Sequence, residues 1–255
     1  MAKYKLPHFL TGEETPVEGE VAFRTHFAGK IIVGIDEVGR GPLAGPVVAC
    51  AAVLKAPDVL PSLNDSKKLT RPRREAMFED VKEACLCYAI ASASVDEIDS
   101  INILEADFLA MRRALAALGM PGLSASEPEI PVEVKGSFDD CVAAFNAQVS
   151  SVDFFTAPSP EVLIAVDGNL KIHGVPDAVQ QPVVKGDGLV ASISAASILA
   201  KVFRDRYMDK LAEAYPGYGF EKHAGYGTKS HLEAIRKLGF TPEHRKSFHP
   251  KGLDF

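Results

Sequence analysis

Residues 31–46 read Ile31-Ile-Val-Gly-Ile-Asp36-Glu37-Val-Gly39-Arg40-Gly41-Pro-Leu-Ala-Gly45-Pro46, and they indicate both a buried strand and a candidate site. The β-branched run ahead of Asp36 is typical of a strand buried on both faces. Neighbouring strand side chains point to opposite faces, so Asp36 and Glu37 can share one ion only if the strand breaks there. The flanking glycines supply such a break around Arg40, whose planar guanidinium suits a phosphate or a sugar edge. The stretch therefore predicts a metal site beside a basic turn, with a solvated strand end and an ordinary turn as the alternative.

The length and composition indicate a globular protein with a sizeable core. The 255 residues are 47% hydrophobic, and no apolar run approaches the length of a membrane span. The first residues lack the apolar stretch of a signal peptide, so we expect a cytoplasmic location. The four cysteines have neither zinc-ligand nor disulfide-scaffold spacing, and we expect them to be reduced packing residues.

The charge of the chain is unevenly distributed. The net charge of -6 argues against a protein that coats nucleic acid by bulk attraction. Residues 182–255 nevertheless hold twelve Lys or Arg against eight Asp or Glu, whereas the rest of the chain holds sixteen against twenty-six. This pattern favours a basic binding flank beside an acidic site, with chance asymmetry as the alternative.

Strand and helix patterns alternate along the chain, which predicts an α/β domain with a mixed sheet. The polar residues 1–29 are expected to form a loosely packed N-terminal extension. Residues 121–160 are expected to form an inserted surface excursion with a short helix near 139–148. The expected strands are 31–36, 47–54, 87–95, 162–166 and 182–184, and the other expected helices are 70–84, 96–118, 192–215 and 230–238.

Three of these strand regions end in an acid with glycine close by, namely Ile35-Asp36-Glu37, Val166-Asp167-Gly168 and Lys185-Gly186-Asp187-Gly188. Ligands gather at strand ends in open α/β sheets, so the acids can converge. Converging carboxylates repel one another unless a cation neutralises them, and all-oxygen ligands select magnesium or manganese rather than zinc. Two such cations suit phosphoryl chemistry, and the chain has no Walker motif. Separate Asp-Gly turns are the alternative.

A series of motifs in family order resembles ribonuclease HII, the type 2 ribonuclease H family. The resemblance covers roughly residues 31–250 apart from the insertion. The motifs are Gly34–Pro46, Asp65-Ser-Lys-Lys-Leu69, Ile98–Leu104, Val166-Asp-Gly-Asn169, Val184-Lys-Gly-Asp187, Ile193–Asp205, Tyr215–Phe220, Gly225-Tyr-Gly-Thr228 and His244–Phe248.

The resemblance implies an α/β ribonuclease H-like fold, with a central mixed five-stranded sheet flanked by helices and a helical C-terminal part. The catalytic domain would span 30–215, and 216–255 would bind substrate. The implied activity is hydrolysis of the RNA strand in RNA/DNA hybrids, and nicking on the 5' side of single ribonucleotides embedded in duplex DNA. It implies Mg²⁺ or Mn²⁺ as cofactor, 3'-hydroxyl and 5'-phosphate products, and a monomer that acts in ribonucleotide removal.

Motif positions also imply the role of each site residue. The metal carboxylates and catalytic residues would be Asp36, Glu37, Asp167 and Asp187. Recognition of the ribose 2'-hydroxyl would fall to Gly39, Arg40 and Gly41, stacking on the neighbouring sugar to Tyr226, and backbone contacts to Lys67 and Asn102. Asp205 is a rival fourth carboxylate, although its position beside Lys201 and Arg204 favours surface ion pairs. The histidines at 223, 231 and 244 are expected to contact phosphate or solvent.

Several alternatives stay open. A type 3 ribonuclease H would prefer long hybrids, but that type usually has a lysine in place of Arg40 and a sizeable N-terminal binding domain. A non-catalytic hybrid-binding protein would lack at least one of the four carboxylates. The final residues, Gly252-Leu-Asp-Phe255, resemble a short docking peptide for a replication clamp, and an apolar chain end that simply packs or frays is the alternative.

Overall fold

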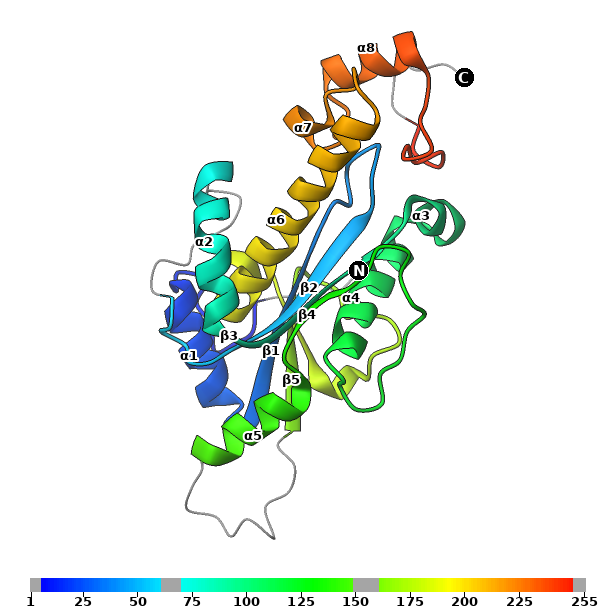
Figure 1. The fold of residues 1–255 in the computed structure, drawn as a ribbon. Coiled ribbons are helices and arrows are strands. Elements are labelled where there is room, and N and C mark those ends of the chain that lie inside the picture. The colour runs from blue at the N-terminus through cyan, green and yellow to red at the C-terminus, as the bar shows by residue number, and fades with distance from the viewer. Residues whose placement is uncertain (1–5, 61–69, 149–160, 250–255) are drawn as a thin grey trace.

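A mixed six-stranded sheet forms the centre of the computed structural model, which describes residues 6–60, 70–148 and 161–249 (Figure 1). The strand order is β4-β3-β2-β1-β5-β6. The first four strands in this order pair antiparallel, and β5 and β6 run parallel to β1. The strands are β1 (Lys30–Val38), β2 (Val47–Leu54), β3 (Cys85–Ala93), β4 (Glu133–Lys135), β5 (Glu161–Asp167) and β6 (Gln180–Val183).

Helices cover both faces of this sheet, as expected for an α/β domain. The described helices are α1 (Pro16–His26), α2 (Arg71–Ala84), α3 (Val95–Ile101), α4 (Ile103–Ala117), α5 (Phe138–Gln148), α6 (Ala191–Ala214), α7 (Phe220–His223) and α8 (Lys229–Leu238). The mixed sheet and the helical C-terminal part are as predicted, but the expected count of five strands is wrong. The sixth strand, β4, lies in the inserted segment, where three residues are too few to give a readable alternation.

The long helix expected over 96–118 is also wrong, because the chain breaks at Asn102. This residue has φ 68° and ψ 163°, outside the helical region. Its side-chain oxygen accepts hydrogen bonds from the backbone N–H groups of Leu104 and Glu105, at 2.9 and 3.2 Å. Asn102 therefore starts α4 as an N-terminal cap, and the apolar spacing continued across the break because both helices face the same core.

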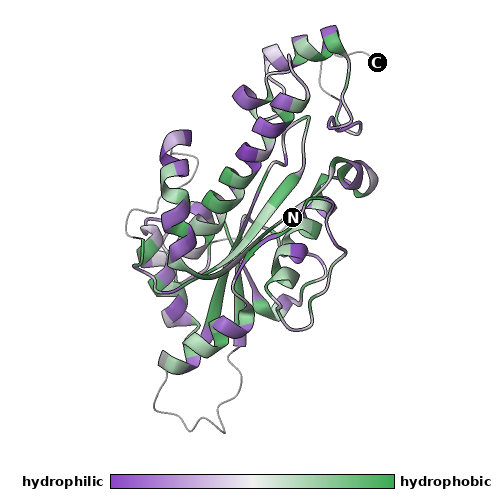
Figure 2. Ribbon diagram, in the orientation of Figure 1, coloured by the Kyte–Doolittle hydropathy of each residue, from purple (hydrophilic) through white to green (hydrophobic). Residues whose placement is uncertain are grey.

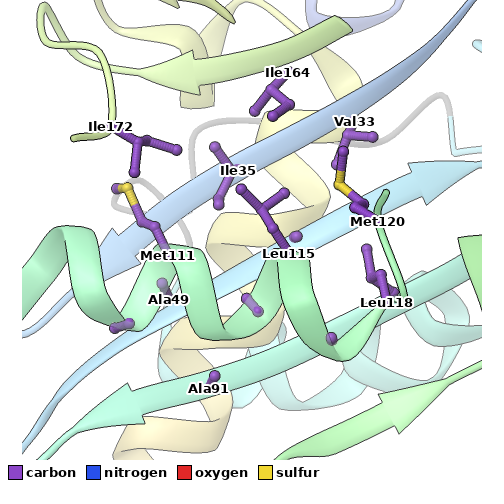
Figure 3. Packing of buried hydrophobic residues seen from close by; sticks show 14 of the residues in the cluster. Val33, Ile35, Ala49, Ala91, Met111, Leu115, Leu118, Met120, Ile164 and Ile172 are labelled. Atoms are coloured by element: carbon purple, nitrogen blue, oxygen red, sulfur yellow. The ribbon is translucent and has the colours of Figure 1, made fainter. Parts of the chain in front are cut away.

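The core lies on both faces of the sheet, and β2 is buried along its whole length. Its odd-numbered residues pack towards α4, where Leu115 lies beside Ile35 in the same buried cluster as Met111 and Ile164 (Figure 3). Its even-numbered residues pack against α2 and α6, through side chains such as Ile198. The strands are accordingly hydrophobic, and the polar residues gather on the outer faces of the helices (Figure 2).

Helix α6 approaches the sheet closely at Gly34 of β1. A β-carbon on Gly34 would lie 2.2 Å from the backbone carbon of Ser192. Only glycine allows this approach, which sets the first turns of α6 against the end of β1 where Asp36 stands.

The N-terminal segment is packed more firmly than expected. Helix α1 starts with a capping box between Thr15 and Glu18, and Phe23 is fully buried. The buried Glu20 carboxylate accepts hydrogen bonds from the backbone N–H and the hydroxyl of Ser192, at 3.1 and 2.7 Å. The expected loose packing is therefore wrong for α1. The sequence did not reveal this packing, because the contacts between α1 and α6 join residues far apart in the chain.

The expectation of four reduced cysteines is wrong for one pair. Cys87 of β3 and Cys141 of α5 form a disulfide, whereas Cys50 and Cys85 are free and buried. The pairing depends on how α5 packs against β3, which the spacing of the cysteines along the chain does not reveal. Within the described residues, no helix has the length and apolar character needed to cross a membrane.

Candidate active site

Three aspartates from separate elements meet at one end of the sheet. Asp36 lies on β1, Asp167 ends the parallel neighbour β5, and Asp187 lies in the short 3₁₀ turn Gly186–Gly188. One carboxylate oxygen from each lies within 4.8 Å of the others. The backbone N–H of Asp187 also donates to Asp167 Oδ1 at 3.2 Å. The convergence expected from the strand ends is therefore present in the fold.

Asp36 has a strongly perturbed carboxyl group. It is buried, and this burial is the main reason that the pKa of its carboxyl lies well above the usual range. The negative charges of Asp167 and Glu37 raise the pKa further. A hydrogen bond from the Ser197 hydroxyl of α6 acts in the opposite direction on this pKa. The sequence interpretation missed Ser197, although its place in the Ile193–Asp205 motif marked the helix that packs on this strand. Carboxylates held together in this way favour a bound cation.

Glu37 is not one of these three converging carboxylates, although its charge contributes to the raised pKa of Asp36. Strand β1 ends at Val38, directly before the expected break at Gly39, but antiparallel pairing with β2 continues through Asp36 and Glu37, so the break does not bring their side chains to one face. Glu37 therefore faces the α4 side of the sheet, and its Oε1 lies 3.6 Å from Nη1 of Arg40. A second carboxylate, Asp107 of α4, lies 3.5 Å from Nε of Arg40.

The Asp107 carboxylate was not expected at the site. It is 2% exposed, and its pKa is raised well above the usual range by burial and then by the charge of Glu37, while Arg40 opposes the shift. Its signal in the sequence was an acid beside Phe108 on the apolar face of an amphipathic helix. That signal becomes interpretable only when Arg40 is known to lie opposite.

Two buried arginines hold the turn that carries Gly39, Arg40 and Gly41. Arg204 of α6 donates to the carbonyls of Pro46, Ala44 and Ala224, at 2.9, 3.1 and 3.0 Å. Arg245 donates to the carbonyls of Gly39, Arg40 and Gly45, at 2.6, 3.0 and 2.7 Å. Both side chains are fully buried, so their donors are matched by backbone acceptors rather than by water. The sequence interpretation missed both, because they act through contacts distant in sequence.

Tyr226 lies beside this turn and is 45% exposed. A β-carbon on Gly41 would lie 3.4 Å from Cε1 of its ring. The fold therefore brings the predicted stacking residue next to the predicted ribose-sensing loop, at the surface. Both segments lie at the end of the sheet where α6 meets α7 and α8 (Figure 1).

A pair of buried histidines, of which His231 contacts the Tyr226 carbonyl, supports the backbone at Tyr226. Nδ1 of His231 lies 2.9 Å from the Tyr226 carbonyl, and Nε2 of His231 lies 3.1 Å from Nε2 of His244. The Thr241 backbone N–H donates to Nδ1 of His244, so the hydrogen-bond pattern assigns the His244 proton to Nε2 and the His231 proton to Nδ1. Burial lowers the pKa of both rings to about 4. The expectation that these two histidines contact phosphate or solvent is therefore wrong.

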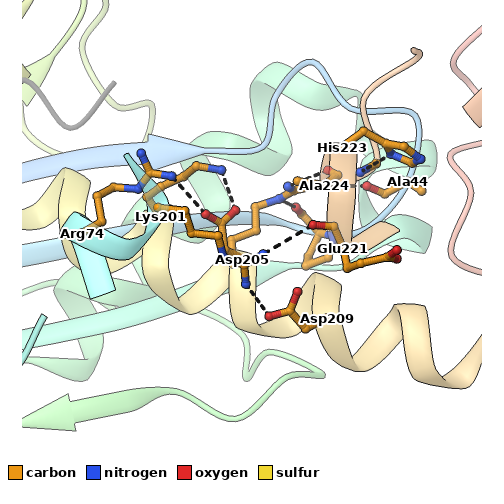
Figure 4. Close-up of polar contacts among 12 residues, drawn as sticks. Ala44, Arg74, Lys201, Asp205, Asp209, Glu221, His223 and Ala224 are labelled. Carbon is orange, nitrogen blue, oxygen red and sulfur yellow. Dashed lines mark hydrogen bonds and ion pairs between the residues drawn. The ribbon is translucent and has the colours of Figure 1, made fainter. Parts of the chain in front are cut away.

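The remaining predicted site residues lie apart from this cluster or outside the described part of the chain. Asn102 is exposed at the junction of α3 and α4. Lys67 and the tail residues 252–255 lie outside the described residues. Asp205 pairs with Lys201 and Arg74, at 2.5 and 3.4 Å, and is absent from the group of converging aspartates (Figure 4). The ion pair with Lys201 is as expected, except that the Asp205 carboxylate is buried rather than at the surface.

The aspartate group fits a hard divalent cation. Asp36, Asp167 and Asp187 offer oxygen donors only, and these donors are close enough to share an ion. Oxygen ligands of this kind suit Mg²⁺ or Mn²⁺, and burial of Asp36 leaves negative charge that a cation would offset.

Comparisons with known proteins agree with this arrangement. The family model for ribonuclease HII matches residues 33–130 and 159–251, and so omits most of the inserted segment. Ribonuclease HII of Shewanella sp. strain W3-18-1 is 45% identical over 227 residues, which cover 88% of this chain and 90% of that protein. Ribonuclease HII of Ruegeria pomeroyi is 43% identical over 239 residues, which cover 94% of this chain and 83% of that protein.

Solved structures support the fold. Ribonuclease H2 from Pyrococcus horikoshii aligns with a TM-score of 0.54 and 24% identity over 85% of this chain and 93% of that one. A chain of the PCNA:RNase HII complex from Archaeoglobus fulgidus aligns with a TM-score of 0.60 and 20% identity over 88% of this chain and 98% of that one. On the family model and the extent of these identities, the chain belongs to the ribonuclease HII family, and it is an endonuclease that hydrolyses the RNA strand of RNA/DNA hybrids with the help of a divalent metal.

Proposed function

We propose that this enzyme also nicks duplex DNA on the 5' side of a single embedded ribonucleotide, by a two-metal-ion mechanism. The observation that carries the proposal is the position of the Asp36, Asp167 and Asp187 oxygens, all within 4.8 Å, at the end of the strand that leads into the turn of Gly39, Arg40 and Gly41. Three carboxylates that can bind metal ions lie beside a turn that presents backbone groups and a guanidinium. This arrangement is suited to binding a phosphodiester next to a ribose.

The carboxylates and the turn would have separate tasks in this reaction. Asp36, Asp167 and Asp187 would hold two divalent ions, and Glu37, whose charge already acts on Asp36, would be the fourth acid once its side chain turns from Arg40. Such ions, when bound, supply an activated water and stabilise the leaving oxygen of an in-line displacement. The chain itself then orients the scissile phosphate and needs no nucleophilic side chain. Cleavage would leave 3'-hydroxyl and 5'-phosphate ends and serve ribonucleotide removal from DNA.

Recognition of the single ribonucleotide would depend on the turn and on Tyr226. The turn is held by the two buried arginines, so its backbone and the Arg40 side chain are presented in a fixed conformation. Tyr226 lies against Gly41 with almost half of its surface exposed, and its ring can stack on a sugar. Arg40 and the backbone at Gly39 and Gly41 would read the 2'-hydroxyl, which distinguishes RNA from DNA.

Carboxylate variants test the metal assignment on a duplex that contains one ribonucleotide. Asp36→Asn and Asp187→Asn should each lower turnover by at least about 100-fold, since even removing a partner of a metal ligand costs 10–100-fold. Both variants should still bind the duplex. Asp205→Asn is the matched control, because its carboxylate pairs with Lys201 and Arg74, and it should lower stability more than turnover. An active Asp187→Asn variant together with an inactive, folded Asp205→Asn variant would move the fourth role to Asp205.

The preferred metal and the partner of the tail are separate proposals. Either Mg²⁺ or Mn²⁺ suits an all-oxygen site, and parallel titrations of activity with each ion would rank them. Contact of Gly252–Phe255 with a replication clamp is supported by its composition and by the Archaeoglobus relative that was solved in complex with PCNA. Removing residues 252–255 should abolish co-elution with the host's clamp without changing cleavage of a short duplex; unaltered co-elution would refute the contact.

A further inference from the structure

The Arg40 side chain lies between two carboxylates of different surroundings. Glu37 lies 3.6 Å from its Nη1, and Asp107 lies 3.5 Å from its Nε. The Arg40 side chain is 46% exposed, so it remains accessible to a ligand while both acids contact it. A long, flexible side chain held in this way loses less conformational freedom when a ligand arrives.

Asp107 is an unusual residue for its position. It occupies the core-facing side of α4, with Ala106, Phe108 and Met111 in the surrounding apolar cluster. One of its carboxylate oxygens, Oδ1, is buried and has no hydrogen-bond partner among the described residues. Burial of a carboxylate with an unsatisfied oxygen opposes folding, so this residue is costly for stability. A costly buried acid whose one ion-pair partner among the described residues is Arg40 indicates a role in function.

The two carboxylates that contact Arg40 have different roles at the site. The proposed function assigns Glu37 to the metal in addition to its contact with Arg40, whereas Asp107 of α4 is outside the group of converging carboxylates and contacts Arg40. We propose that Asp107 is a positioning residue that holds Arg40 towards the ribose and leaves Glu37 available to the metal. The proposal rests on the proposed function of the turn and adds to it a specificity-determining residue of α4.

The test measures binding without metal, so that turnover plays no part. Fluorescence anisotropy in EDTA would compare a duplex containing one ribonucleotide with the all-DNA duplex of the same sequence. Asp107→Asn should weaken binding of the ribonucleotide duplex by about fivefold, as expected for a partly exposed ion pair, and should leave the all-DNA duplex within about twofold. Its melting temperature should stay the same or rise, because an unsatisfied buried charge has been removed.

Glu97→Gln is the matched control. Glu97 also pairs a carboxylate with an arginine, since its two oxygens accept from Arg113 at 2.6 and 2.8 Å, and neither residue contacts the turn. We expect this variant to lower the melting temperature and to leave binding of both duplexes unchanged. The opposite effects of the two substitutions separate a positioning role from a structural one.

Combination with Arg40→Ala separates this inference from the function on which it rests. In the Arg40→Ala background, Asp107→Asn should cause no further loss of binding. A full fivefold loss in that background, or unchanged binding in Asp107→Asn alone, would overturn the positioning role even where Arg40→Ala itself weakens binding. An Arg40→Ala variant with unchanged preference for the ribonucleotide would overturn the proposed recognition by the turn and this inference with it. Asp107→Ser provides a second uncharged side chain, and if neither variant folds, Asp107 is structural and the proposal is wrong.

Discussion

Tyr226 lies directly against Gly41, because a β-carbon on this glycine would be 3.4 Å from Cε1 of the ring. The two residues come from opposite ends of the chain, and the buried Arg204 joins their segments by donating to Ala44 beside the turn and to Ala224 before Tyr226. The position of the ring relative to the turn is therefore set by the fold before substrate binds.

Removal of the Tyr226 ring should slow cleavage at single ribonucleotides. Stacking of a base on an aromatic side chain contributes about 1–3 kcal/mol, so a comparable contact with sugar predicts a loss of roughly 5- to 100-fold in kcat/KM for Tyr226→Ala. Tyr226→Phe keeps the ring and should retain most of the activity. Steady-state rates on the single-ribonucleotide duplex would measure both, and equal rates for Tyr226→Ala and the unchanged enzyme would rule out stacking.

Substitution of Gly39 should destabilise the fold through both its conformation and its contacts. Gly39 has φ +100°, and an added β-carbon would lie 2.4 Å from Nε of Arg204 and 2.8 Å from the Pro46 carbonyl oxygen. Gly29 has φ +84° with open space around it, so Gly29→Ala should cost about 1–2 kcal/mol from conformation alone. Gly39→Ala should cost about 1–3 kcal/mol more, from overpacking. Urea unfolding would show this difference, and equal losses would mean that the turn can relax.

Bound metal should stabilise the protein through the acid group. Wild-type protein at 100 times the metal dissociation constant should gain about 2.7 kcal/mol, or roughly 5–10 °C in melting temperature. Asp36→Asn should raise the melting temperature in EDTA, because it removes a buried charge, and should lose most of the gain on adding Mn²⁺. Differential scanning fluorimetry would compare both proteins with and without metal. A full gain in Asp36→Asn would exclude this residue as a main metal ligand.

The direction of the Asp36 shift also gives a pH dependence for the metal-free protein. Its pKa is raised in the folded state, so the stability linked to this group is present below its unfolded pKa and is lost as pH rises through the folded value. The melting temperature of the wild-type protein in EDTA should therefore fall relative to Asp36→Asn as pH rises. A constant difference between the two proteins across the range would contradict the raised pKa.

The buried histidine pair predicts the opposite dependence on pH. Both rings have pKa values lowered to about 4, so the unfolded chain binds more protons than the folded one between about pH 6.5 and pH 4. Stability linked to the pair is complete above pH 6.5 and declines by on the order of 3 kcal/mol for each ring as pH falls through this window.

Urea unfolding at a series of pH values would test the histidine pair. His244→Gln should be less stable than the wild-type protein near pH 7.5 and should lose less stability on acidification. His249 is exposed and serves as the control position, so His249→Gln should follow the wild-type curve. Identical acid dependence in His244→Gln and wild-type protein would remove the pair as the source.

The strands and the acid positions were predictable because their signals are local. Asp36 and Asp167 follow apolar β-branched runs, and the rule that ligands gather at strand ends brought them together without knowledge of the fold. The break at Asn102 was not predictable in this way, since the apolar spacing of α3 continues in α4 and only the cap geometry at Asn102 separates them.

The residues that position the site could not be identified from the sequence for a different reason. Arg204 and Arg245 resemble ordinary basic residues in the sequence, and their role arises from carbonyl groups that the fold brings to them. Asp107 is likewise defined by Arg40, a residue of another element. Local patterns identify groups that carry chemistry, whereas supporting contacts between distant segments require the three-dimensional structure.

The most direct measurement is product mapping on duplex DNA with one internal ribonucleotide, in Mg²⁺ and in Mn²⁺. We predict a single nick on the 5' side of the ribonucleotide, with 3'-hydroxyl and 5'-phosphate ends, no cleavage of the all-DNA duplex, and loss of the product in Asp36→Asn. Folded enzyme that cleaves a long RNA/DNA hybrid but leaves the single ribonucleotide intact with both metals would contradict the proposed function.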